Sequence, residues 1–148
     1  MKKLSKIFYW ALSLTWGLLM TLLGLTTAVV LLCCGKKPYP NMHGYYFIVG
    51  KGWGGFNMGP ISVVSENPSR HTLNHEFGHS IQNCYLGPLL PFLVAIPSAI
   101  RYWYREWLVR SGRKTYYELP AYDSIWFEGT ATSIGNKYWE EVKECLTE

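Results

Sequence analysis

The sequence lacks the cysteine spacing of a disulfide framework. Its four cysteines stand at positions 33, 34, 84 and 145, with no Cys-x-x-Cys pair. It also lacks a basic cluster beyond its first residues: Lys2, Lys3 and Lys6 are three of the 14 Lys and Arg, which leaves eleven against ten Asp and Glu. Nucleic-acid binding needs clustered basic residues on the folded part, so we expect no nucleic-acid partner.

The chain also lacks internal repeats, low-complexity tracts and the length for a second domain. At 148 residues it has room for one modest core. Aromatic residues are abundant, with seven Trp and eleven Tyr. Such a composition is typical of proteins that work against lipid or hold extended ligands.

The N-terminal part contains a run of 25 residues without a charge, residues 8–32, which Lys6 precedes and Lys36 follows. A helix of that length, at ~1.5 Å per residue, exceeds the ~30 Å hydrocarbon thickness of a bilayer. We therefore expect a transmembrane anchor over residues 1–35, a linker over residues 36–43 and a domain over residues 44–148.

A cleaved signal peptide is the alternative interpretation of this N-terminal segment. It fits less well, because the apolar run continues past Thr26, Thr27 and Ala28, the small residues at which cleavage would occur. The lysine balance slightly favours a domain outside the cytoplasm. The expected localisation is therefore the membrane, with a single pass.

The remaining chain predicts an α+β domain. Two β-branched and aromatic runs, residues 45–49 and 61–65, flank a glycine-rich segment and predict a hairpin. Asn67-Pro68-Ser69 predicts the start of a helix that ends near Cys84. Residues 89–100 are expected in the core, residues 101–114 on a surface helix that either contacts the membrane or is an ordinary amphipathic helix, and residues 124–146 in a final helix.

The segment His75-Glu76-Phe77-Gly78-His79 has a specific chemical meaning. Residues four apart lie on one face of a helix, so two imidazoles converge on one ion while Glu76 projects beside it. Zinc accepts imidazole nitrogen and keeps a position open for water when three protein groups bind it. The segment predicts zinc bound by His75 and His79, with Glu76 as the catalytic base. The competing interpretation is two polar residues on an amphipathic helix.

A third metal ligand must come from elsewhere in the chain. We expect Glu128, because a carboxylate on a second helix, with the small residues Gly129 and Ala131 close by, can approach the motif helix. The rivals are Glu118, Asp123, His43 and His71. His71 lies one turn before His75, but three stacked imidazoles cannot all reach one tetrahedral ion from a straight helix.

Four further residues are candidates for supporting roles. Asp123 is expected either to accept the free N–H of a ligating histidine or to cap the helix that starts near Ser124. Tyr116, Tyr117 and Tyr122 are candidate donors to a developing oxyanion.

The motif, its helix and the downstream glutamate helix resemble the zincin metallopeptidases, nearest to the gluzincin type. More narrowly, the chain is similar to small bacterial metallopeptidase-like domains that also occur at the ends of some Rhs-repeat proteins. The resemblance rests on residues 75–98, with Gly87-Pro88 and Ile96-Pro97-Ser98, and on Tyr122-Asp123-Ser124 and residues 128–131. It covers roughly residues 52–136 and is strong at the five-residue motif.

The resemblance implies a minimal zincin-like fold with a small sheet and the motif helix. It implies zinc held by His75, His79 and Glu128, Glu76 as general base, and an edge strand over residues 57–64 that pairs with an extended peptide. The expected partners are a peptide or protein substrate and the membrane. Two other functions remain open: a membrane-tethered interaction module with a structural or vestigial metal site, and a toxin-like effector protease.

Overall fold

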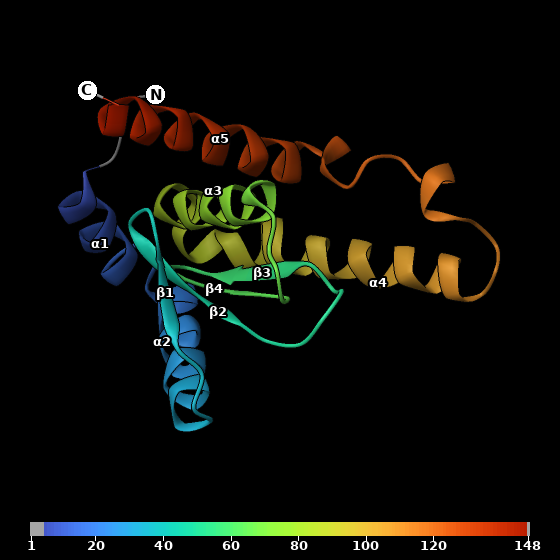
Figure 1. Ribbon diagram of the computed structural model, residues 1–148, viewed down its shortest axis with the longest axis horizontal. Coiled ribbons are helices and arrows are strands. Elements are labelled where there is room, and N and C mark those ends of the chain that lie inside the picture. The colour runs from blue at the N-terminus through green and yellow to red at the C-terminus, as the bar shows by residue number, and fades with distance from the viewer. Residues whose placement is uncertain (1–4, 148) are drawn as a thin grey trace.

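The computed structural model describes residues 5–147 of the chain, and their side chains up to residue 140. It is an α+β structure with a small sheet, as expected, but the sheet is mixed and no single transmembrane helix precedes it among the described residues. The four strands are β1 (Pro38–Asn41), β2 (Gly44–Ile48), β3 (Gly55–Met58) and β4 (Ile61–Val64), in the order β1-β2-β4-β3. In Figure 1, helix α3 (Arg70–Leu86) lies between this sheet and helix α5 (Trp126–Thr147).

The predicted hairpin between residues 45–49 and 61–65 is wrong. β2 and β4 are parallel neighbours, with Tyr45 opposite Ile61. The glycine-rich segment between them forms β3, which returns antiparallel to β4 and becomes an edge of the sheet. The expected edge strand over residues 57–64 is therefore split: its first residues lie in β3, and its last four form the internal strand β4. Residues of the expected linker form β1, the opposite edge.

Helix α3 starts at Arg70 with Ser69 as its N-cap, two residues after the Asn67 cap that the sequence suggests, and Pro68 lies outside the helix. The Ser69 hydroxyl oxygen accepts a hydrogen bond from the Thr72 backbone N–H at 3.0 Å, which satisfies a donor of the first helical turn. Apolar α3 side chains such as Phe77 and Ile81 pack with Tyr9 and Tyr138 in one core cluster. Helix α5 likewise covers the range expected for the final helix.

The predicted transmembrane helix over residues 8–32 is wrong. This segment forms two helices, α1 (Lys6–Leu14) and α2 (Leu18–Cys33), which are bent by 97° relative to each other. Among the described residues, no single helix has both the length and the apolar character that crossing a membrane requires. Two sharply bent helix pairs meet these criteria when each pair is taken together, one being α1 with α2.

Polar contacts explain why the apolar run breaks. Asn83 of α3 donates a side-chain hydrogen bond to the carbonyl of Gly17 at 3.2 Å, and the Trp16 indole donates to the carbonyl of Tyr85. The Thr21 hydroxyl lies 2.8 Å from the carbonyl of Ser13, across the bend. The Thr21 hydroxyl replaces the backbone donor that the carbonyl of Ser13 would have in a continuous helix, and the other two bonds tie the bend to α3.

The chain turns again after α3. A 3₁₀ turn (Gly87–Leu89) and a π-helical turn (Pro91–Ala95) lead into α4 (Ile96–Arg110). The helical run Arg70–Leu89 and the run Pro91–Arg110 are bent by 115° relative to each other. The expectation that residues 89–100 lie in the core is met in part. Leu90 and Val94 are buried with Met20 and Phe127, whereas Ile100 is exposed. Two 3₁₀ turns, Tyr116–Glu118 and Tyr122–Ser124, return the chain to α5.

Candidate metal centre

The close contact between α3 and α5 brings the candidate ligands together. A Cβ atom at Gly78 would lie 1.9 Å from the carbonyl oxygen of Ala131, and one at Gly135 would lie 1.8 Å from that of Asn74. The two helices therefore touch backbone to backbone, which any side chain at these positions would prevent. Gly78 is an interior residue of the motif, and Glu128 lies one turn before Ala131, so this contact delivers Glu128 to the histidines.

Three potential ligand atoms converge at this contact. The Nε2 atoms of His75 and His79 are 3.1 Å apart, and they lie 3.0 and 3.2 Å from Oε2 of Glu128. Ligands bound tetrahedrally to zinc at about 2.0–2.1 Å would lie about 3.4 Å from one another. The spacing of the three atoms therefore fits one zinc ion. The Glu128 side chain is fully buried, and the two histidine side chains are 12% and 11% exposed.

The other nitrogen of each ring is held by a neutral side chain. His79 Nδ1 lies 2.8 Å from Oε1 of Gln82, whose amide nitrogen donates to the carbonyl of Phe127. That second bond fixes the amide orientation, so Nδ1 of His79 carries a proton, and Nε2 is the nitrogen that faces Glu128. His75 Nδ1 lies 2.8 Å from the hydroxyl of Thr132. Such contacts orient ligating histidines.

Glu128 supplies the negative charge of the site. Although burial opposes ionisation, hydrogen bonding to His75 and His79 holds the pKa of its carboxyl below the usual range. Its second oxygen, Oε1, is buried without a hydrogen-bond partner among the described residues. A carboxylate with a free buried oxygen, beside two imidazole nitrogens, is the donor set that zinc prefers, so the residues fit the ion that the sequence predicts.

Glu76 lies beside this group in a different environment. It is 4% exposed, and burial is the main cause that raises its pKa to about 7, with a further contribution from the charge of Glu128. Its Oε2 is buried without a partner among the described residues. A Cβ atom at Gly55 would lie 2.7 Å from its other oxygen, so the backbone of edge strand β3 runs directly past the carboxyl.

Of the three candidate tyrosines, the structure brings Tyr122 to the site. Its hydroxyl lies 3.0 Å from that of Ser98. Burial, with nearby charges from Glu128 and Glu76, raises its pKa. Tyr116 instead donates to Glu106 on α4, and Tyr117 is fully exposed. Neither is near the motif.

The rival ligands are not brought to the histidine pair. Glu118 accepts hydrogen bonds from Thr115, and His43 lies in the aromatic cluster with Tyr9 and Phe77. His71 stacks on His75 at 6.3 Å between ring centroids and is exposed. The partners of the Nδ1 atoms of His79 and His75 in the structure are Gln82 and Thr132, not Asp123. The structure records no contact between the Asp123 side chain and either ring.

The sequence alone did not identify Gln82 or Thr132 as partners of the histidine rings. The contact of Gln82 could have been predicted, since Gln82 lies three residues after His79 and therefore on the same helical face. Thr132 lies four residues after Glu128, which places it one turn along α5. Its role depends on the relative rotation of two helices, which no local pattern reveals.

Comparisons with known proteins add no further identification. No protein-family model matches the chain, and no curated protein or solved structure is significantly similar to it. The geometry of the site and the chemistry of its residues therefore carry the functional argument.

Proposed function

We propose that the chain is a zinc-dependent metallopeptidase, with the ion held by His75, His79 and Glu128 and with Glu76 as the general base. The observation that carries the proposal is the convergence of three ligand atoms within 3.2 Å, beside a second buried carboxyl. Two buried carboxyl groups with opposite pKa shifts are typical of sites that divide charge stabilisation and proton transfer between them.

The number of ligands favours catalysis over a structural role. Among the described residues, the group of candidate ligands contains these three and no fourth His, Cys, Asp or Glu. Structural zinc sites are closed by four protein ligands, whereas catalytic sites keep one position open. When bound, zinc would supply Lewis acidity and lower the pKa of water at the open position. Glu76, with its unpaired Oε2, is placed to accept the proton and return it to a leaving amine.

The neighbouring edge strand favours a peptide as substrate. β3 pairs with β4 along one side only, so its outer backbone groups are available to an extended chain. Because Gly55 of β3 abuts Glu76, a peptide paired with this edge would run past the general base. A side chain at position 55 would occupy that space.

Tyr122 is the candidate that we propose for oxyanion stabilisation. Its raised pKa keeps the phenol protonated over the neutral range, as a hydrogen-bond donor must be. The hydroxyl of Ser98, from α4, lies 3.0 Å from the Tyr122 hydroxyl and holds it in place. Tyr122→Phe should therefore lower the rate of hydrolysis while leaving metal binding intact.

The proposal is tested by measuring metal content and peptide hydrolysis on the same preparations of the full chain. We expect one zinc per chain in the unaltered protein and in Glu76→Gln, and none in His79→Ala or Glu128→Ala. Hydrolysis of a fluorogenic peptide mixture should fall by about 10² or more in Glu76→Gln, because the base is lost while the ion remains.

Glu118→Gln is the matched control, since it makes the same chemical change in an exposed carboxyl far from the histidines. It should keep both zinc and activity. Equal zinc affinity in Glu128→Ala would show that Glu128 is not a ligand. Full hydrolysis by Glu76→Gln would remove the proposed base.

A further inference from the structure

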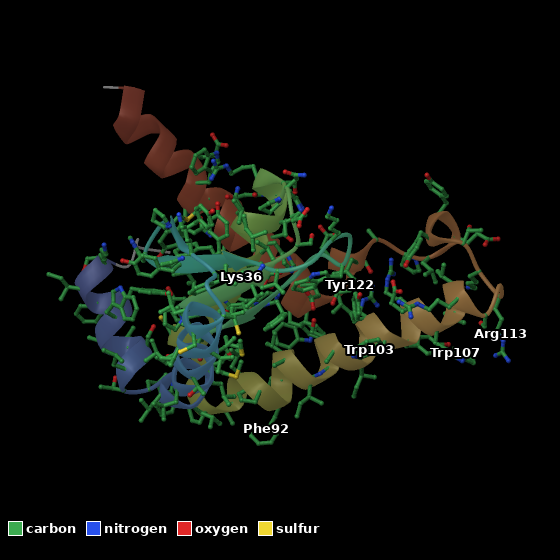
Figure 2. The ribbon with its side chains drawn as sticks, turned by 60° about the horizontal axis from the view of Figure 1, so that its bottom comes forward. Lys36, Phe92, Trp103, Trp107, Arg113 and Tyr122 are labelled. Carbon is green, nitrogen blue, oxygen red and sulfur yellow. The ribbon has the colours of Figure 1, made fainter. Side chains whose placement is uncertain are left out.

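Helix α4 has an apolar face with no partner. None of its 15 residues, all of which the structure describes, is buried. Six large apolar side chains of α4 and the turn before it are 43–65% exposed: Phe92, Leu93, Ile96, Ile100, Trp103 and Trp107. Their spacing of three and four residues places them on one side of the helix. Figure 2 shows Phe92, Trp103 and Trp107 following one another along α4.

The opposite face of α4 is occupied by the protein itself. Arg101 donates to the carbonyl of Ala121, and Arg105 donates to that of Pro120. Both guanidinium groups also lie within 6 Å of the Tyr122 ring. The segment that returns to α5 therefore covers the inner face of α4 and accepts the hydrogen bonds of its arginines. The apolar outer face remains exposed to solvent or to another molecule.

Helix α2 has a second exposed apolar face. Its inner residues Met20, Gly24 and Ala28 are buried against the domain. Its outer side chains are uncharged and between 36% and 59% exposed: Leu18, Leu22, Leu25, Val29 and Leu32. The helix extends away from α5 in Figure 1. Met20 packs with Leu90 and Val94, so α2 adjoins the segment that leads into α4.

Basic residues outnumber acidic ones around these two faces. The first 65 residues contain no Asp or Glu, and Lys36 and Lys37 follow the end of α2. Arg110, Arg113 and Lys114 stand at the end of α4, where Arg113 lies 4.4 Å over the Trp107 ring. In contrast, four of the ten acidic residues fall in the last nine positions, and α5 lies on the side of the molecule away from the tip of α2.

We propose that the outer faces of α2 and α4 form a docking surface for an anionic lipid bilayer. The apolar side chains lie among the upper acyl chains, Trp103 and Trp107 lie at the interface, and the basic residues meet lipid phosphates. This arrangement requires no helix to cross the bilayer. It is independent of the metal centre, because none of these residues contacts the histidines or Glu128.

Charge favours lipid over a second copy of the chain as the occupant. A two-fold interface would bring identical faces together, and neither face offers an unpaired acidic group to the basic ends of the other. Glu106 is the acidic residue of α4, and it is already bound to Arg110. Lipid phosphates supply the missing negative charge, and acyl chains cover the apolar residues.

Vesicle flotation with the full chain, diluted from mild detergent, tests this surface. We expect the protein to float with vesicles of phosphatidylcholine and phosphatidylglycerol, and less with phosphatidylcholine alone. The double variant Ile100→Glu/Trp103→Glu should reduce the bound fraction about tenfold or more, since it places two charges on the apolar face. Arg113→Glu/Lys114→Glu should weaken binding to the anionic vesicles specifically.

Tyr117→Glu is the matched control, because it places a charge on a fully exposed aromatic residue outside both faces. It should float like the unaltered protein, and circular dichroism should show the same helix content in all variants. Equal flotation of the Ile100→Glu/Trp103→Glu variant would overturn the proposal. So would a protein that does not float and sediments as a dimer that this variant makes monomeric, since a second copy would then be the occupant.

Discussion

The helix pair α3–α5 and the outer helices α2 and α4 distribute polar and apolar residues in opposite ways. The buried residues of α3 include Glu76, His79, Gln82 and Asn83, which are polar or charged. Helix α4 buries nothing and exposes its aromatic and aliphatic side chains. Burying polar groups and exposing apolar ones both cost free energy, so each arrangement is expected where a ligand or partner offsets the cost.

The largest expected effect comes from closing the space between α3 and α5. Gly78→Ala places a methyl group 1.9 Å from the carbonyl oxygen of Ala131, so the helices must separate. We expect the free energy of unfolding to fall by about 3 kcal/mol, measured by urea denaturation, with loss of bound metal. Thr130→Ala, on the exposed side of α5, should change it by no more than about 0.5 kcal/mol. Equal stabilities would show that the helices do not need this contact.

If the proposed zinc ion is bound, removing it should weaken the same helix pair. Without a cation, the three converging groups lose the partner that holds His75, His79 and Glu128 together. At free zinc about 100-fold above the dissociation constant, chelation should lower the free energy of unfolding by about 2.7 kcal/mol, visible as a lower melting temperature. His79→Ala should show no response to chelator. A chelator response that His79→Ala retains would place the stabilising ion elsewhere.

A smaller effect is expected from the residue that orients His79. Gln82→Leu removes the acceptor for Nδ1–H and leaves this ring free to turn. Zinc affinity, measured by competition with a chromogenic chelator, should fall by about 10- to 100-fold. Gln82→Glu restores an acceptor and should recover part of the affinity. Unchanged affinity in Gln82→Leu would show that packing alone sets the ring orientation.

The smallest effect on stability is expected on the outer face of α4. Ile100→Ala should change the free energy of unfolding by no more than about 0.5 kcal/mol, because the side chain is 65% exposed. Val94→Ala, which is buried beside Met20 and Leu90, should cost about 2 kcal/mol by thermal or urea denaturation. If Ile100→Ala cost as much as Val94→Ala, the outer face would be packed within the fold.

The sequence predicted well where the deciding contacts are local. The segment Asn67-Pro68-Ser69 signals the start of α3 to within two residues, although Ser69 is the cap, and the shared face of His75 and His79 follows from a spacing of four residues in a helix. The reach of Glu128 to this pair was inferred from the small residues near it. The structure adds that Gly78 and Ala131 make the contact, which depends on how two helices from distant parts of the chain rotate against each other.

The failures lie where distant residues decide. The apolar run over residues 8–32 satisfies a length criterion for a bilayer, but Asn83 holds the carbonyl of Gly17, and the run bends there. The strands next to the glycine-rich segment look like a hairpin. The segment between them instead forms β3, which runs antiparallel to β4, so β4 pairs in parallel with β2.

By itself the sequence determined the motif helix and the pair of imidazoles on one face, because backbone geometry fixes the relation between residues one turn apart. Tertiary structure decided the bend between α1 and α2, the parallel pairing of β2 with β4 and the contacts that Gln82 and Thr132 make with the rings. Each of these depends on hydrogen bonds between groups that are far apart in the sequence, so no local pattern predicts them.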